Sequence, residues 1–356
     1  MSVNQGLAQA SSDFMIAALL IYSLAVLAFA GDFAFGRPRR SAAAKSAVAE
    51  RTPELAAVGA GTAVVGAAAG SAGGAPAAPS GPAGGGGSLP QRRESVLQAI
   101  GNAGSWIRAA VALSVVGVAA HLTAVVLRGF AVHRAPWGNM YEFVTALTCV
   151  AAIFFVYVMI RYRAWALGVF VIGSIVIALG LAETVIYTAA GPLVPALQSY
   201  WLSIHVTAMT LSTGIFFVAA VLGIMYPVAA RYRARVAAGK AQSGSNGLLE
   251  RIPEPAQLDK LTYRTVIFGF PIWTFGVIAG AIWADQAWGR YWGWDPVETW
   301  AFITWVLYAA YLHARATAGW RRFANYIQLL GFASLAFNIL VVQVFITGLH
   351  SYAGVG

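Results

Sequence analysis

The 356-residue chain is 59% hydrophobic and only 10% charged, a composition that excludes an ordinary soluble globular domain. The formal net charge of +10 is not arranged as a basic stripe, so the sequence does not favour a nucleic-acid-binding protein. Cys149 is the single cysteine, which excludes an intrachain disulfide and a CxxC redox pair. These features predict an all-α, polytopic integral membrane protein.

The first predicted element is an apolar run over residues 14–30, extendable to Phe35. Its length is close to that of a membrane span, and a cluster of three arginines follows it. A cleaved signal peptide is the alternative, because small residues near position 30 resemble a cleavage site, but no Lys or Arg precedes Phe14. We therefore predict a retained N-terminal transmembrane anchor at 1–36, with its N-terminus outside.

A segment rich in Ala, Gly, Ser and Pro follows at 37–105 and includes GPAGGGGS at 81–88. Such a composition cannot bury a hydrophobic core. We predict that this segment is a flexible linker on the cytoplasmic side.

Seven further apolar spans make up the predicted core, 106–356, which brings the total to about eight transmembrane helices. Eight crossings place both termini on the outside. The spans are predicted at about 107–127, 140–160, 164–182, 201–226, 265–284, 298–313 and 324–347.

The basic residues indicate the orientation of these spans. With eight crossings, only Arg128, Arg134 and Arg290 lie outside, and the other 20 of the 23 Lys and Arg residues lie inside. This bias follows the positive-inside rule even when the long linker is discounted. The segment between the sixth and seventh spans is therefore predicted to face outward.

The sixth span, 265–284, contains two features that affect helix packing. Gly276 and Gly280 form a small-xxx-small pair, which predicts close approach of a neighbouring helix. Pro271 predicts a kink, with the freed backbone groups satisfied by neighbouring helices.

The outward segment 283–300, WADQAWGRYWGWDPVETW, concentrates aromatic rings beside charged side chains. Gly289, Gly293 and Pro296 interrupt a long helix, so the rings are expected to line a surface or shallow platform for a flat, apolar ligand with a polar rim. An interfacial anchoring belt is the alternative, since Trp and Tyr gather at membrane surfaces. The candidate contact residues in this segment are Trp283, Trp288, Arg290, Tyr291, Trp292, Trp294, Asp295 and Trp300.

The pattern W-A-x-x-x-W-G-x-Y-W-x-W-D-P-x-E-T-W resembles the tryptophan-rich WWD signature of haem-handling proteins in cytochrome c maturation. The size and order of the spans over residues 105–356 are most similar to the CcsA/ResC family of the System II pathway, whose members carry varying names in actinobacteria. CcmC and CcmF belong to the same motif group. The family usually has Lys where this chain has Val297, so any role of that Lys is absent or moved here.

Two histidines lie at the predicted outer face, on either side of this segment in the sequence. His205, in SYWLSIHV, begins the fifth span, and His350, in GLHSY, follows the eighth. Neutral imidazoles are good haem-iron ligands, and two of them make a six-coordinate site that excludes stray ligands; an interfacial His is otherwise commonly just solvated or hydrogen-bonded. Both sequences resemble the external His motifs of the family, which implies that the pair ligates the iron of one haem b. No CxxCH sequence is present, so this haem is expected to be held non-covalently.

His313, in YLHAR, ends the seventh span on the predicted cytoplasmic side. It lies 14 residues beyond Thr299, or about 21 Å at helical rise, so it cannot share an iron with the outer pair. The resemblance implies a second, inner haem site in which His313 is the iron ligand and the partner membrane protein supplies the opposite one. The alternative is a histidine that joins Arg315 at a helix end.

The other two histidines, His121 in the second span and His133 in an outer loop, match no ligand motif of the family. An intramembrane histidine is a functional candidate by default. Structural hydrogen bonding is nevertheless the interpretation that we prefer for both.

The outer loop APWGNMYEF, 135–143, also resembles the family, and Trp137, Tyr141 and Glu142 are expected to complete the wall of the outer site. Haem has two propionates, for which the outward arginines are chemically suitable partners. Lipid phosphate is the alternative partner for these arginines.

The resemblance implies a subunit of a membrane cytochrome c synthetase in the bacterial plasma membrane. With a CcsB/ResB-type partner it would take up haem on the cytoplasmic side, export it and present it to apocytochrome c for thioether attachment; a thiol-reducing, thioredoxin-like protein is a further implied partner. The contribution of this chain would be orientation of the haem. Two other classes remain open, a membrane b-type cytochrome that exchanges electrons with quinone and a haem-free transporter or scaffold.

Overall fold

The computed structural model describes residues 3–35, 95–192, 198–240 and 248–350, and all regular structure in these ranges is helical. The chain divides into two compact units, 1–36 together with 96–356, and 37–95. Most of the predicted linker therefore lies outside the described residues. Its last part contains a short helix, α3 (Val96–Gly101).

Each of the eight predicted spans is a helix, and the prediction of an all-α, polytopic membrane protein is confirmed. Seven helices in the described ranges are long and apolar enough to cross a membrane; α10 is not among them, because its composition is more polar. The number of crossings and the side on which the termini lie stay predictions. The helices are α1 (Gln5–Phe35), α4 (Ser105–Val132), α5 (Met140–Tyr162), η1 (Trp165–Leu167) with α6 (Gly168–Thr184), α7 (Tyr200–Ala237), α8 (Leu248–Arg251), α9 (Pro255–Trp288), α10 (Pro296–Ala316), α11 (Arg321–Phe337), the π-helix η3 (Asn338–Val342) and α12 (Gln343–Phe345).

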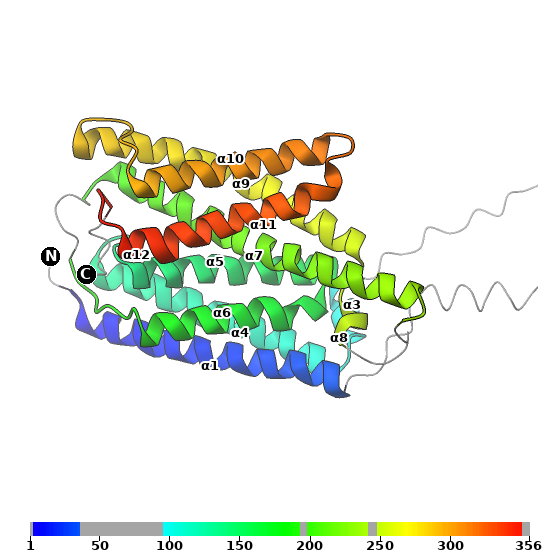
Figure 1. The fold of residues 1–356 in the computed structure, drawn as a ribbon. Helices are drawn as coiled ribbons and strands as arrows, with labels where there is room; N and C mark the ends of the chain where they lie inside the picture. The colour runs from blue at the N-terminus through cyan, green and yellow to red at the C-terminus, as the bar shows by residue number, and fades with distance from the viewer. Residues whose placement is uncertain (1–2, 36–94, 193–197, 241–247, 351–356) are drawn as a thin grey trace, which may run out of the picture. The chain divides into compact units, whose positions relative to one another are not determined.

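The long helices form two packed groups in one bundle (Figure 1). In the first group α1 packs on α4 and α6, which both contact α5; in the second, α7 packs on α9, and α10 and α11 pack on each other beside them. Contacts between α5 and α7 join the groups. The helix α1 begins, and α12 ends, at the end of the bundle that also holds the α9–α10 turn (Figure 1).

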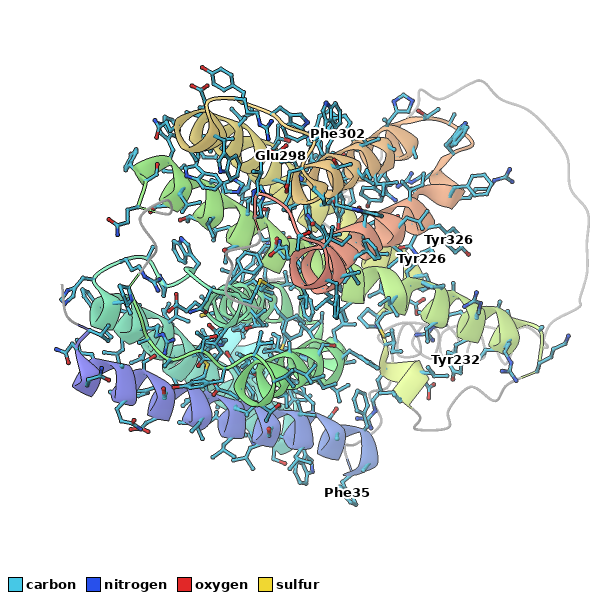
Figure 2. All side chains as sticks on the ribbon, turned by 60° about the vertical axis from the view of Figure 1, so that its left-hand side comes forward. Phe35, Tyr226, Tyr232, Glu298, Phe302 and Tyr326 are labelled. Atoms are coloured by element: carbon cyan, nitrogen blue, oxygen red, sulfur yellow. The ribbon has the colours of Figure 1, made fainter. Side chains whose placement is uncertain are left out.

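Large apolar side chains project from the surface of this bundle. Phe35, Phe302 and Tyr326 are 76%, 41% and 55% exposed and point outward (Figure 2). An apolar surface of this kind suits contact with lipid, whereas a soluble protein rarely exposes it over a large area.

A buried ion cluster joins the two loops next to the α9–α10 turn. The carboxylate of Glu142, fully buried at the start of α5, accepts hydrogen bonds from Arg128 Nε at 3.1 Å and from Arg134 Nη1 at 2.7 Å. The two arginines also donate to the carbonyl oxygens of Thr188 and Gly191 in the loop after α6. One carboxylate therefore holds the α4–α5 loop and the α6–α7 loop together.

Replacing Glu142 should destabilise the bundle, because Glu142→Ala leaves two largely buried arginines without their counter-charge. We expect the free energy of unfolding to fall by about 3–5 kcal/mol, measured by thermal or denaturant unfolding in detergent. Glu254→Ala is the matched control, because its pair with Arg233 is exposed and should contribute about 0–1 kcal/mol. Equal effects of the two substitutions would show that the Glu142 cluster is not a structural anchor.

Candidate functional site

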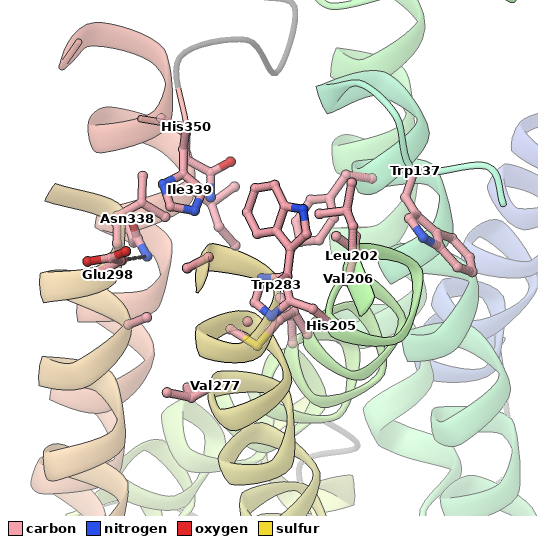
Figure 3. A pocket seen from close by; sticks show the side chains of 18 of the residues that line it. Trp137, Leu202, His205, Val206, Val277, Trp283, Glu298, Asn338, Ile339 and His350 are labelled. Atoms are coloured by element: carbon pink, nitrogen blue, oxygen red, sulfur yellow. Dashed lines mark hydrogen bonds between the residues drawn. The ribbon is translucent and has the colours of Figure 1, made fainter. Parts of the chain in front are cut away.

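A cavity opens near the α9–α10 turn, among α5, α7, α9, α10 and the C-terminal helical segments (Figure 3). Most of its wall is apolar or aromatic, and a few polar groups converge on it, which is the usual character of a small-molecule site. Of the residues predicted to contact a ligand, those that line it are Trp137, His205, Trp283, Trp288, Tyr291, Trp292 and His350.

His205 is positioned by the close packing of α7 against α9. Its Nδ1 atom lies 2.7 Å from the carbonyl oxygen of Gly276, and a Cβ atom on Gly280 would come within 2.6 Å of the same ring. The predicted small-xxx-small contact is confirmed, and the space that it leaves admits an imidazole. Because a carbonyl oxygen only accepts, Nδ1 carries the proton, and Nε2 keeps a lone pair for a metal or a hydrogen-bond donor.

Asp295 positions the second imidazole. Its Oδ2 atom lies 2.8 Å from Nδ1 of His350, and its Oδ1 atom accepts a hydrogen bond of 2.6 Å from the backbone N–H of Leu349. Asp295 is also the N-cap of α10, where it accepts from the N–H of Val297, and Glu298 completes a capping box. The same carboxylate therefore fixes a helix start and the C-terminal segment that carries His350.

The surroundings of Asp295 keep its carboxyl group ionised. Burial acts to raise its pKa, but the hydrogen bonds from His350 and from the backbone N–H groups of Leu349 and Val297 outweigh burial, so the pKa lies below its usual value. An ionised Asp295 accepts a hydrogen bond from the Nδ1–H group of His350 and leaves Nε2 as the ring nitrogen available for a metal. This carboxylate–histidine pair is the arrangement that commonly supports a metal-binding imidazole.

The indole of Trp283 lies between the two imidazoles (Figure 3). Its centroid is 6.4 Å from that of His205, with the rings stacked at 12°, and 6.1 Å from that of His350, with the rings edge-on at 64°. Trp288 closes the cluster, 4.8 Å from Trp283 and 5.3 Å from His350. Two imidazoles thus contact the same flat aromatic ring from different directions.

Only 289–295 of the predicted outward segment lies outside the helices. Gly289, with φ 69°, ends α9 in the left-handed conformation that suits glycine, and Pro296 begins α10. Trp294 adopts φ 55°, which is uncommon for a residue with a side chain and is a form of backbone strain often seen at functional sites. The turn directs Trp292 into the cavity and leaves Trp294 67% exposed.

The remaining candidate residues lie away from the cavity wall. Trp300 packs on Phe337 with centroids 4.4 Å apart, and Arg290 is exposed on the turn. His313 is exposed near the other end of α10, 17 residues from Pro296 and so about 25 Å from the turn. Its Nε2 atom lies 3.4 Å from the hydroxyl of Thr317.

The structure corrects the expectation that Tyr141 and Glu142 complete the cavity wall. Glu142 is held in the arginine cluster, and the hydroxyl of Tyr141 donates to Glu183 at 2.8 Å. Trp137 and Arg134 do line the cavity, and Arg128 does not.

The structure gives His133 a hydrogen bond through its backbone and leaves the ring of His121 without one among the described residues. His133 ends α4 in the left-handed conformation, and its N–H donates to the carbonyl of Phe130 at 3.3 Å. The imidazole of His121 is fully buried edge-on to Tyr22, and neither ring nitrogen makes a hydrogen bond of normal geometry to any described residue. The expectation is therefore not met by the side chain of His121.

Sequence reasoning missed several wall residues, among them Met209, Trp273 and Asn338. Asn338 is buried at the start of the π-helix, where its amide donates to the carbonyl of Val297 at 3.2 Å. An amide within an apolar span was the signal that could have identified it, since polar residues in a membrane segment usually face the protein interior. Met209 and Trp273 have no such signal, because apolar residues fill every span.

Comparison with known proteins places residues 137–350 in the family described as cytochrome C assembly protein. The chain is 36% identical over 245 residues to the cytochrome c biogenesis protein CcsA of Heterosigma akashiwo, an alignment that covers 61% of this chain and 76% of the relative. It is 38% identical over 235 residues to CcsA of Guillardia theta, with the same coverages. A solved structure of the cytochrome c haem lyase CcmF aligns with 69% of this chain and 44% of its own, with a TM-score of 0.48 and 20% identity.

Removing the carboxylate of Asp295 should release the C-terminal segment. In Asp295→Ala, α10 loses its N-cap and the backbone N–H of Leu349 loses its acceptor, so we expect the free energy of unfolding to fall by about 1–3 kcal/mol. We also expect faster hydrogen exchange at the Leu349 amide, measured by mass spectrometry. Asp13→Ala is the control, because Asp13 makes an exposed contact on α1. Unchanged protection at Leu349 would contradict the anchoring role of Asp295.

Proposed function

Because the chain belongs to the cytochrome c assembly protein family and is similar to its CcsA members along most of their length, we propose that its cavity binds haem b without a covalent bond and presents it to apocytochrome c. It is a multi-pass membrane protein of cytochrome c biogenesis. The observation that carries the proposal is the convergence of two imidazoles with engaged Nδ1 atoms on one aromatic-lined cavity.

The residues of the cavity fit such a ligand. In both imidazoles Nδ1 is held by a hydrogen bond, so each has Nε2 left for iron. The ring of Trp283 lies parallel to that of His205 within 12° and also contacts His350, so the space around the two histidines already accommodates a planar aromatic group. Bound haem b would supply an iron for the two imidazoles and vinyl groups to which cytochrome thiols add.

The aromatic wall would orient the porphyrin through ring contacts. Trp137 reaches the cavity from the α4–α5 loop, and Trp288 and Trp292 reach it from the end of α9 and the turn that follows. Each such contact contributes about 0.5–1.5 kcal/mol beyond simple burial. Orientation matters because the thiols of the incoming cytochrome must meet a defined edge of the ligand.

Arg290 is the preferred cation for a propionate. Arg128 and Arg134 are both already paired with the carboxylate of Glu142, whereas no described carboxylate forms an ion pair with Arg290. Arg290 is exposed on the turn that carries Tyr291 and Trp292 into the cavity. A guanidinium at this rim can form two parallel hydrogen bonds with a carboxylate.

We further propose that the chain works in the bacterial plasma membrane with a CcsB/ResB-type partner, with the α9–α10 turn on the extracytoplasmic side. The excess of basic residues in the loops on the other side supports this orientation. His313 lies near the opposite end of α10 from the cavity, which supports an inner haem site completed by the partner. A thioredoxin-like reductant would keep the cytochrome thiols reduced.

Replacing either cavity histidine should convert the low-spin, six-coordinate spectrum of the haem-loaded protein to a five-coordinate one. We expect haem retention to fall roughly tenfold or more in His205→Ala and in His350→Ala, with partial recovery on addition of imidazole. His133→Asn, away from the cavity, is the control. Wild-type spectra in both alanine variants would contradict the proposal. The absence of a Soret band in the wild-type protein would favour a haem-free scaffold.

Replacing His313 should impair the delivery of haem to the outer cavity without impairing the binding of haem there. Purified His313→Ala should bind added haem in the outer cavity with the wild-type spectrum, but the same variant isolated from cells should contain several-fold less haem. The reason is that His313 lies about 18 Å along α10 from Ala301, the last residue of that helix to line the cavity, and is assigned to uptake on the other side. Normal haem content in cells would leave His313 as a helix-end residue.

A further inference from the structure

The helix α11 turns its polar face toward the protein interior. Asn325, Gln328 and Ser334 are 8%, 0% and 5% exposed, whereas Leu330 on the opposite face is 59% exposed. Asn325 and Gln328 contact Gly223 of α7, and Ser334 contacts Thr304 of α10. In a membrane segment such residues are retained when they bind one another or a polar guest.

The helix α10 presents a matching line of polar groups. Thr304 and Ser334 are hydrogen-bonded at 3.0 Å between their hydroxyl oxygens. Tyr308 and Tyr311 follow Thr304 on the same buried face, at 0% and 1% exposure. The next turn carries Arg315, which pairs with Asp259 of α9 at the opposite end of the bundle from the cavity.

The backbone of α7 leaves space for these side chains. A Cβ atom on Gly223 would come within 2.2 Å of Oε1 of Gln328, and the carbonyl oxygen of Gly223 accepts from Asn325 Nδ2 at 3.1 Å. On α11, a Cβ atom on Gly331 would come within 3.3 Å of the Tyr308 ring. Two glycines therefore admit polar side chains where larger residues would exclude them.

The polar groups in the middle of this line have no hydrogen bond of normal geometry to the described residues, although the Tyr308 hydroxyl lies close enough to Gln328 to interact with it. Among the described residues, the hydroxyls of Tyr308 and Tyr311 and both amide atoms of Gln328 are buried without a hydrogen bond of normal geometry. Each such group costs about 1–3 kcal/mol when it is left unpaired, and no bulk solvent reaches it inside a membrane. Small polar guests that donate and accept, of which water is the simplest, would satisfy all four atoms.

We propose that α7, α10 and α11 enclose a water-binding polar file, formed by Thr304, Tyr308, Tyr311, Asn325, Gln328 and Ser334, between the cavity wall and the Arg315–Asp259 ion pair. Ser334 lies at the end of the file nearer the cavity, one residue before Leu335, which lines the cavity wall. From Thr304 to Arg315 it covers 11 residues of α10, or about 16 Å.

A file of this kind would give the cavity an exchange route for protons. Tyrosine hydroxyls, amides and water both donate and accept hydrogen bonds, so a proton entering at one end can be matched by one leaving at the other. The ion pair at the far end would link the file to the opposite side of the bundle. The inference does not depend on haem and holds for any ligand of the cavity.

Cysteine accessibility tests the file, since Cys149 is the single native cysteine and can be replaced by alanine. In that background, Gln328→Cys and Ser334→Cys report on the file, and Leu330→Cys reports on the outward face of the same helix. A charged methanethiosulfonate reacts with the thiolate, which forms only next to water. In lipid nanodiscs we expect both file positions to react at least tenfold faster than Leu330→Cys. If Gln328→Cys reacts no faster than Leu330→Cys, the file is overturned, even if Ser334→Cys is reactive.

A second measurement uses the unmodified chain and so does not depend on the folding of variants. Hydroxyl radicals generated by X-ray radiolysis of water oxidise aromatic side chains beside bound water. Tyr308 and Tyr311 should be oxidised well above Phe155, which is equally buried in an apolar part of the bundle. Protection of both tyrosines to the level of Phe155 would also overturn the proposal.

Discussion

The site depends above all on one buried carboxylate. Asp295 accepts hydrogen bonds from the first turn of α10, from the N–H of Leu349 and from the imidazole of His350, although Leu349 and His350 lie 54 and 55 residues further along the chain. A carboxylate in a buried position is stable as an ion only when such donors surround it. The same carboxylate therefore fixes both the start of α10 and the position of His350.

The other imidazole is fixed by packing and not by charge. His205 lies against the backbone of α9 because Gly276 and Gly280 have no side chains to exclude it. Helices in a membrane associate largely through such close contacts, since lipid is as apolar as a leucine side chain. Two histidines that are 145 residues apart thus reach one cavity by different means, and Trp283 fills the space between them.

Much of the fold follows from hydropathy, because each apolar run long enough to span a membrane became a helix. The helix ends do not follow from it. The helix α7 runs on to Ala237, past the predicted 226, and α9 begins at Pro255, before the predicted 265, since a helix can continue after the apolar window ends. The short polar turn 289–295 was similarly predicted too long, because Trp283 to Trp288 complete α9 and Pro296 to Trp300 already belong to α10.

The sequence predicted which histidines lie at the site but not how the side chains around them are arranged. Topology alone placed His205 and His350 at one face, but the contact of Asp295 with His350 depends on the path of the whole chain between them. The direction of each aromatic ring in the turn is likewise set by backbone angles such as φ 55° at Trp294, which composition does not encode. For that reason Trp294 and Trp300, equal to Trp292 in the motif, lie away from the cavity.

The most direct test of iron ligation by His205 and His350 is an electron cryomicroscopy structure of the haem-loaded chain. The account predicts iron within about 2.0–2.2 Å of Nε2 of both His205 and His350, a distance typical of metal–imidazole bonds, with Nδ1 of each ring still held by Gly276 and Asp295. It also predicts that the indole of Trp283 has left the space between the two rings. Haem bound elsewhere, or bound here while Trp283 keeps its place between the imidazoles, would contradict the account.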